Sequence, residues 1–212
     1  MSDLEDITLE EARKNAKEPL KDGTKSDVSK GEYDGKAYVL KEDRISLPFH
    51  KLNSNLHHRR LTQPDSESEL LKALENTGSV PKLIKAFNDH SFMMEYIEGT
   101  PLKQDIENEE RIYKVVASLK KIHDAGYYHG DTRTSNIIDD KIIDVQFGGK
   151  INSENDVFKD LLIFTYSIGH RSKKGQEFAY NAIGEIYSPE TAQKLKDHEL
   201  TFFEKRLLRK YI

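Results

Sequence analysis

The chain has no cysteine, no long apolar run and no excess of positive charge. Without cysteine it can form neither a disulfide framework nor a thiolate zinc site. Its longest apolar stretch, around Leu161–Phe164, is far too short to cross a bilayer, so we expect no membrane segment. A net charge of −4 argues against a surface that binds nucleic acid as a whole, although local basic patches are compatible with it.

The amino-terminal residues Met1–Asp6 are acidic and lack the basic start and apolar core of a secretion signal. Together with the absence of cysteine, this favours a cytoplasmic location, with the nucleus as the second choice. The 212 residues are enough for one domain or for two small lobes that share a core.

The stretch from Tyr128 to Gly149 carries the strongest chemical signal. Asp131 follows a His-Gly turn, Asn136 comes five residues later, and Asp144 follows a short β-branched run. Phosphoryl transfer needs a carboxylate that takes or orients the acceptor's proton, and oxygen ligands that hold Mg²⁺ against the phosphates. We assign the first task to Asp131 and the second to Asn136 and Asp144. For either half alone, Asp-rich turns flanking a strand are the simpler interpretation.

A lysine and a phosphate loop are expected upstream if the nucleotide is ATP. Lys41 ends the predicted strand Ala-Tyr-Val-Leu-Lys, and Glu67 begins a predicted amphipathic helix, so the two are candidates for the ion pair that holds the phosphates. Glu69 is the second candidate for this pairing. Of the residues that a phosphate loop requires, only Gly23 and Val28 are present, and for that segment alone a plain hairpin is the better interpretation.

The predicted strand in Ser91–Gly99 ends at a glycine and suits a hinge that binds adenine. Its backbone would offer a carbonyl and an amide from Glu95 and Ile97, with Met94 lining the base pocket. An apolar strand that only closes a core is the alternative.

Further elements follow from turn signals and periodicity. Thr8 and Glu11 have the spacing of a capping box, which predicts a short helix to about residue 17, closed by Pro19. Helices are also predicted over 107–125, 156–168 and 200–212, with another that begins at Ser188-Pro189. Asp160 is expected either to hold the 129–136 loop or to be an ordinary helix carboxylate. His123 is expected to be packed at a helix end.

The order of these motifs resembles the protein-kinase-like superfamily, and most closely the small RIO-like kinase subunit of the KEOPS (EKC) complex, the PRPK group. The likeness runs from about Leu20 to Leu161, and more loosely to the carboxyl end. Three pieces carry it: His129-Gly-Asp-Xaa-Xaa-Thr-Ser-Asn136; Arg44 to Pro48 with Leu52 and Arg59-Arg60-Leu61-Thr62; and Met94-Glu-Tyr-Ile-Glu-Gly99.

The resemblance implies an α+β, bilobal kinase-like fold. It places a helical extension at residues 1–18, an N-lobe at 19–97, and a largely helical C-lobe at 98–212 that ends in a basic helix. It also implies an ATP- and Mg²⁺-dependent Ser/Thr kinase or ATPase in a complex that makes threonylcarbamoyladenosine in tRNA. The threonylcarbamoyl-transferase subunit would dock on the C-lobe and a small KEOPS subunit on the N-lobe, with tRNA contacted through the complex.

The chain departs from that family at several positions. Arg133 replaces a Thr, and we expect its charge to act on the γ-phosphate. Val-Gln separates Asp144 from Phe147-Gly, and Gly130 stands where many kinases have the Arg that reads a phosphorylated activation loop. Activity is therefore expected to depend on partner proteins. The basic tail is limited to Lys205, Arg206, Arg209 and Lys210.

Two other functions fit the same motifs. One is a catalytically inert scaffold that binds nucleotide for structural reasons, which magnesium-dependent phosphate release would exclude. The other is a small-molecule kinase of the aminoglycoside or lipopolysaccharide type, although 212 residues leave little room for the extra helices of its substrate pocket.

Overall fold

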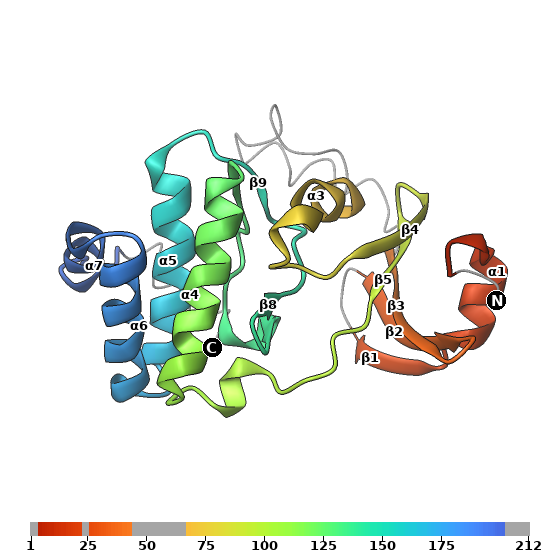
Figure 1. Ribbon diagram of the computed structural model, residues 1–212, viewed down its shortest axis with the longest axis horizontal. Helices are drawn as coiled ribbons and strands as arrows, with labels where there is room; N and C mark the ends of the chain where they lie inside the picture. The colour runs from red at the N-terminus through yellow and green to blue at the C-terminus, as the bar shows by residue number, and fades with distance from the viewer. Residues whose placement is uncertain (1–3, 23–25, 44–66, 202–212) are drawn as a thin grey trace. The chain divides into compact units, whose positions relative to one another are not determined.

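The computed structural model describes residues 4–22, 26–43 and 67–201, which form two compact units (Figure 1). The N-unit comprises Met1–Glu75 and Pro81–Ile97, and the C-unit comprises Asn76–Val80 and Glu98–Ile212. Three features predicted from the sequence lie outside the described residues. These are Gly23, the Arg44–Thr62 motif and the basic cluster of the tail.

The N-unit is built on an antiparallel sheet of five strands in the order β1-β2-β3-β5-β4. Its strands are β1 (Glu18–Asp22), β2 (Ser26–Tyr33), β3 (Lys36–Asp43), β4 (Leu83–Asn88) and β5 (Ser91–Glu95). Asp34 and Gly35 both have positive φ, the conformation that a tight two-residue hairpin requires, and they join β2 to β3 as the Asp-Gly signal predicts. Strand β4 begins at Leu83, so Pro81 lies before the ladder.

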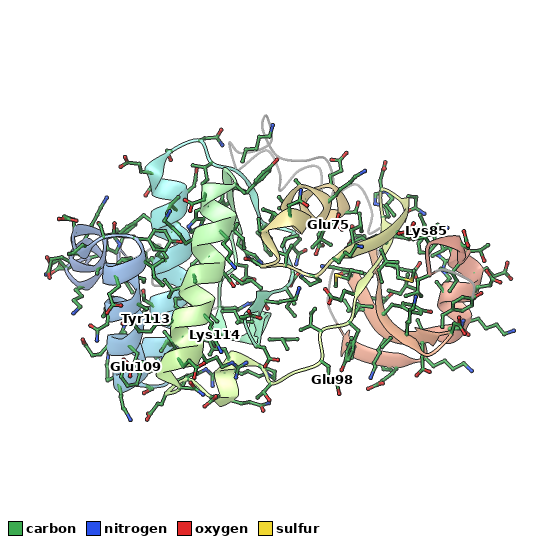
Figure 2. All side chains as sticks on the ribbon, in the orientation of Figure 1. Glu75, Lys85, Glu98, Glu109, Tyr113 and Lys114 are labelled. Atoms are coloured by element: carbon green, nitrogen blue, oxygen red, sulfur yellow. The ribbon has the colours of Figure 1, made fainter. Side chains whose placement is uncertain are left out.

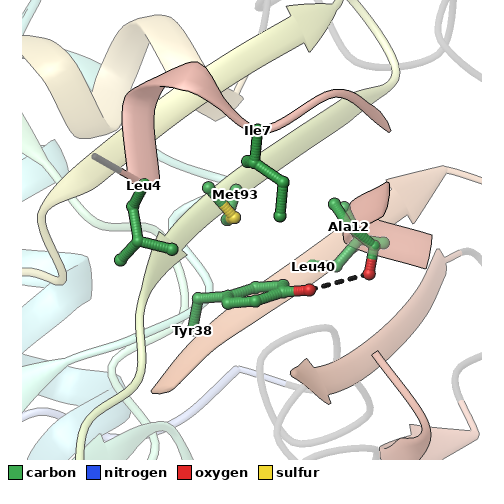
Figure 3. Packing of buried hydrophobic residues seen from close by; sticks show 6 residues of the cluster. All are labelled: Leu4, Ile7, Ala12, Tyr38, Leu40 and Met93. Carbon is green, nitrogen blue, oxygen red and sulfur yellow. Dashed lines mark hydrogen bonds between the residues drawn. The ribbon is translucent and has the colours of Figure 1, made fainter. Parts of the chain in front are cut away.

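The amino-terminal segment shares a core with this sheet. The helical turn η1 (Leu4–Asp6) and helix α1 (Leu9–Asn15) precede β1, and the predicted capping box between Thr8 and Glu11 is present. Ile7 and Ala12 pack with Tyr38 and Met93, and the Tyr38 hydroxyl donates to the Ala12 carbonyl at 2.8 Å (Figure 3). The expectation that Pro19 closes the helix is wrong, because α1 ends at Asn15 and Pro19 belongs to β1.

Strand β4 contacts two further helical elements of the N-unit, η1 and α3. The Lys85 ammonium group on β4, labelled in Figure 2, donates to the carbonyls of Glu5 and Ile7 at 2.6 and 2.9 Å. Helix α3 (Glu67–Leu74) buries its apolar face, as its periodicity predicts, and continues into the turn η2 (Glu75–Thr77). The buried residues of α3 are Ser68, Leu70, Leu71 and Leu74.

The C-unit is mainly helical. Its helices are α4 (Glu109–Asp124), α5 (Glu154–Gly169), α6 (Lys173–Ile186) and α7 (Pro189–Lys196), and α6 packs against the other three (Figure 1). Helices α4, α5 and α7 were predicted, whereas α6 was not. Short elements connect α4 to α5, and they include the stretch from Tyr128 to Gly149 that contains Asp131. They are β6 (Tyr127–Tyr128), η4 (Thr134–Asn136), β7 (Ile137–Ile138), β8 (Lys141–Ile142) and β9 (Gly149–Lys150), and η3 (Leu102–Gln104) precedes α4.

Within the described ranges, no helix combines the length and apolarity that crossing a bilayer demands.

Candidate active site

Lys41 and Glu67 form a buried ion pair in the N-unit. Lys41 lies on β3 opposite Val28 of β2, and its Nζ atom is 2.7 Å from Glu67 Oε2 at the start of α3. Their side chains are only 4% and 9% exposed, so the ammonium group is held in one place by its partner. Removing either charge would leave the other buried and uncompensated. Of the two predicted partners, Glu67 is the one that pairs with Lys41.

The predicted hinge residues follow the same sheet. Met94 is buried on β5 opposite Val39, and Glu95 ends the strand. The Glu95 amide donates to the Lys82 carbonyl at 2.9 Å, and the Lys82 amide donates to the Glu95 carboxylate at 3.1 Å. These contacts fix the backbone just before Ile97, the last residue of the N-unit.

Asp160 holds the loop that carries Asp131 in the C-unit. This α5 residue is fully buried, and its carboxylate accepts the backbone N–H groups of His129 at 2.6 Å and Gly130 at 2.8 Å. Its own carbonyl accepts the Thr132 hydroxyl at 2.5 Å. Asp160 therefore fixes three points of one tight loop, which is the first of the two roles that the sequence leaves open for it.

His129 and Gly130 shape the turn itself. The His129 ring is buried, and its Nδ1 atom accepts the Asp131 amide at 3.2 Å; burial lowers the pKa of this histidine, so the ring is neutral at neutral pH. Gly130 has φ of +82°, and a Cβ atom there would stand 2.2 Å from the Phe147 carbonyl oxygen. A side chain at position 130 is therefore excluded by two independent constraints.

The Asp131 carboxyl is buried and lies beside one cation. Arg133 Nη2 donates to Asp131 Oδ2 at 2.8 Å, while Asp131 Oδ1 has no hydrogen-bond partner among the described residues. Burial raises the pKa of Asp131; Arg133 and His129 oppose this shift, and the charge of Asp144 adds to it. The outcome is a buried carboxylate with one unpaired oxygen and a raised affinity for a proton, which suits a group that accepts or orients one.

Asn136 and Asp144 stand at the two ends of the β7–β8 hairpin. The buried Asn136 side chain donates its Nδ2 hydrogen to the Asp131 carbonyl at 3.2 Å, so its amide oxygen is the atom left for a metal. The Asn136 carbonyl accepts the Ile143 amide at 2.8 Å, which brings the residue before Asp144 next to it. Asp144 has φ of +66°, a strained conformation that often marks functional positions.

The inserted Val-Gln pair changes which side chain packs behind Asp144. Val145 is fully buried, whereas Phe147 is 38% exposed. The Gly148 amide donates to the Val145 carbonyl at 2.8 Å, so the chain turns immediately after the carboxylate. Val145 thus fills the apolar position directly after Asp144, and sequence reasoning missed it because Phe147 is the more obvious apolar candidate.

The donor set fits a hard divalent ion bound together with phosphate. Among the described residues, no three His, Cys, Asp or Glu side chains gather closely enough to bind a metal by themselves. One carboxylate and one amide oxygen, from Asp144 and Asn136, instead match the way in which Mg²⁺ is held by few protein ligands while water and phosphate oxygens complete its octahedron.

The amino-acid sequence of the chain is similar to one protein family and to several known proteins. The family model described as the RIO domain matches residues 31–153, more than half of the chain. The EKC/KEOPS complex subunit BUD32 of Encephalitozoon cuniculi is 31% identical over 162 residues, which cover 72% of this chain and 80% of that protein. A probable bifunctional tRNA threonylcarbamoyladenosine biosynthesis protein of Methanothermobacter thermautotrophicus is 27% identical, and the match covers 85% of this chain but only 35% of that protein.

Solved structures agree on the fold. An ethanolamine kinase of Plasmodium vivax superposes with a TM-score of 0.61 at 12% identity, covering 90% of this chain and 73% of that one. WaaP, solved in complex with acyl carrier protein, superposes with a TM-score of 0.59 at 16% identity, covering 95% and 91%. At such identities the likeness establishes the α+β kinase-like fold alone. On the family match and its similarity to BUD32, the chain belongs to the RIO-domain family of kinase-like proteins.

Proposed function

We propose that the chain is an ATP- and Mg²⁺-dependent Ser/Thr kinase or ATPase that works as the kinase-like subunit of an EKC/KEOPS-type complex. The observation that carries the proposal is the loop of the C-unit that contains Asp131. Asp160 accepts the two backbone amides before Asp131, and the Asn136 side chain donates to the Asp131 carbonyl. The β7–β8 hairpin then connects Asn136 to Asp144. This arrangement supplies one proton-accepting carboxylate and two oxygen ligands within a single unit.

Each residue has a defined task in this proposal. The Lys41 ammonium, oriented by Glu67, holds phosphate oxygens, and the backbone of Glu95 and Ile97 binds the base beside Met94. Asn136 and Asp144 would hold Mg²⁺, which when bound neutralises phosphate charge. Asp131 orients the hydroxyl of a Ser, a Thr or a water and accepts its proton, while Arg133 holds the carboxylate in place.

The cellular role is proposed from the relatives. The names BUD32 and tRNA threonylcarbamoyladenosine biosynthesis protein point to a tRNA-modification complex. We infer that this chain supports threonylcarbamoyladenosine formation, with the threonylcarbamoyl-transferase subunit on the C-unit and a small subunit on the N-unit. A cytoplasmic or nuclear location follows from this role. The segment between Asp144 and α5 is short, so activation by these partners is expected in place of activation by loop phosphorylation.

Co-purification followed by an ATP-hydrolysis assay tests the proposal. We expect phosphate release that requires Mg²⁺, rises when the complex and tRNA are present, and disappears in Asp144→Ala. Asp140→Ala, a change of an exposed carboxylate on the same hairpin, is the matched control and should retain activity. Phosphate release that is absent in the intact complex, with nucleotide still bound, would show an inert scaffold and contradict the proposal.

A further inference from the structure

Tyr187 is joined to the Asp131 loop by a line of hydrogen-bonded side chains. Its hydroxyl, just after α6, lies 2.7 Å from Nδ1 of His123 on α4. The other ring nitrogen, Nε2, lies 3.1 Å from Oδ2 of Asp160 on α5. Asp160 accepts the backbone N–H groups of His129 and Gly130, so the line ends at the residues immediately before Asp131.

The direction of each hydrogen bond follows from what the groups can donate. Both Asp160 oxygens receive backbone N–H donors, so the carboxylate is an acceptor and His123 Nε2 must donate to it. In the tautomer that carries its hydrogen on Nε2, Nδ1 has a lone pair, which accepts from the Tyr187 hydroxyl. Burial raises the pKa of Tyr187, so the hydroxyl keeps the proton that it donates. Tyr187 therefore selects the tautomer of His123 that serves Asp160.

Loss of the Tyr187 hydroxyl would disturb this line at a buried point. His123 is only 7% exposed, and its Nδ1 atom would lose its donor where water has little access. The ring could satisfy Nδ1 by changing tautomer, but Nε2 would then present a lone pair to the Asp160 carboxylate. The contact that helps to fix Asp160 would weaken, and the His129 and Gly130 amides would be held less firmly.

We propose that Tyr187 is a positioning residue for Asp131, acting through His123 and Asp160. Its link to catalysis rests on the proposed function, whereas its link to the loop does not. The phenol ring stacks edge-on against His123 with ring centroids 5.8 Å apart, so the ring contributes packing and the hydroxyl contributes the orienting bond. Tyr187→Phe separates the two contributions, because it keeps the ring and removes only the hydroxyl.

The test compares Tyr187→Phe with Tyr180→Phe in the full chain. Tyr180 lies on α6, is also half-buried, and its hydroxyl accepts a hydrogen bond from Gln176 at 3.2 Å without reaching Asp160. Amide hydrogen exchange at His129 and Gly130 is followed by NMR, and kcat and KM for ATP are measured alongside. In Tyr187→Phe we expect exchange about 2- to 10-fold faster and kcat lower by a similar factor, with KM unchanged. Tyr180→Phe should leave all of these at the parent values.

A double-mutant cycle checks the route of the effect. In a His123→Leu background, which removes both ring hydrogen bonds, Tyr187→Phe should have no further effect on exchange. Unchanged exchange in Tyr187→Phe, an equal change in Tyr180→Phe, or a full effect without His123 would each overturn the proposal. Faster exchange with unchanged kcat would also overturn it, because the loop would then be loosened without consequence for the reaction. If the parent protein shows no ATP turnover, the proposed function fails, and the exchange data alone decide whether Tyr187 holds the loop.

Discussion

At the scale of single residues, the ionised form of the buried Asp131 carboxyl is expected to support ATP turnover and to lower the stability of the fold. Keeping this carboxyl ionised at neutral pH costs folding free energy, because burial raises its pKa. Asp131→Asn removes the charge at nearly constant volume. We expect ATP turnover to fall by roughly 10²- to 10⁴-fold, the usual contribution of a proton-accepting group, while the melting temperature stays the same or rises.

The pH dependence of this effect has a definite sign. A carboxyl whose folded-state pKa lies above its unfolded value contributes fully to stability below the unfolded pKa and loses that contribution as pH rises through the folded pKa. The melting temperature of Asp131→Asn should therefore match the parent in acid and exceed it increasingly toward neutral pH. Thermal denaturation of the parent and of Asp131→Asn, measured from acid to neutral pH, provides the check. A variant that melts below the parent at every pH would contradict the assignment of Asp131 as a strained, buried charge.

Arg133 is expected to set the pH at which Asp131 becomes active. Its guanidinium group opposes the burial-driven rise in the pKa of Asp131, so removing it should raise that pKa further. In Arg133→Thr we expect lower turnover and an acid limb of the pH–rate profile displaced to higher pH. Arg171→Thr, which alters an exposed arginine of the same unit, is the control and should leave the profile in place. An unmoved acid limb in Arg133→Thr would exclude this role.

Single residues of the site were predictable when they belong to short motifs. Asp131, Asn136 and Asp144 fall within one stretch of sequence. The distant Lys41–Glu67 pair was expected from the kinase pattern, in which a helix glutamate pairs with the strand lysine. The roles assigned to these residues stay predictions until tested. The contacts that position them were harder to predict. Val145 and the Tyr187–His123 pair depend on tertiary packing, and no local pattern reveals which hydroxyl meets which ring.

At the scale of elements, α6 shows why a helix can escape prediction. Its buried positions are Gly175, Ala179, Ala182 and Ile183, so its apolar face is made mainly of small residues and not of the large aliphatic residues that mark α4. Two glycines within it also lower its intrinsic helix propensity. Close packing explains the choice, since a Cβ atom at Gly175 would stand 2.1 Å from the Ile106 carbonyl oxygen.

Gly175→Ala should therefore destabilise the protein even though alanine is the better helix former. The new methyl group meets rigid backbone, and we expect a loss of about 1–3 kcal/mol in the free energy of unfolding. Gly184→Ala on the same helix is the matched control, because its nearest neighbour is Ala192 Cβ at 3.6 Å, an ordinary contact. That variant should be neutral or more stable by up to about 1 kcal/mol. Urea denaturation measures both, and equal effects would refute the packing argument.

At the scale of the whole molecule, both units carry part of the machinery that the proposal requires. The N-unit supplies the Lys41–Glu67 pair, and the C-unit supplies Asp131, Asn136 and Asp144. The α+β kinase-like fold was predictable because several independent motifs occur in the order that a kinase requires, and a chance match of all of them is improbable. The packing of η1 and α1 residues into the N-unit core was not predictable, because it depends on contacts between segments far apart in sequence.

The proposal assigns one nucleotide to groups from both units. Removing the charge of Lys41 or of Asp144 should therefore abolish the stabilisation of the protein by bound nucleotide. A ligand present at about 100 times its Kd stabilises a protein by about 2.7 kcal/mol, which raises the melting temperature of a chain of this size by several degrees. We expect Mg²⁺-ATP to produce such a rise in the parent, in Lys72→Met and in Asp140→Asn, but not in Lys41→Met or Asp144→Asn. Each rise is measured against the same variant without nucleotide, because Lys41→Met alone leaves Glu67 buried and destabilises the chain. A normal rise in Lys41→Met would remove the N-unit pair from the proposal and leave the nucleotide to the C-unit.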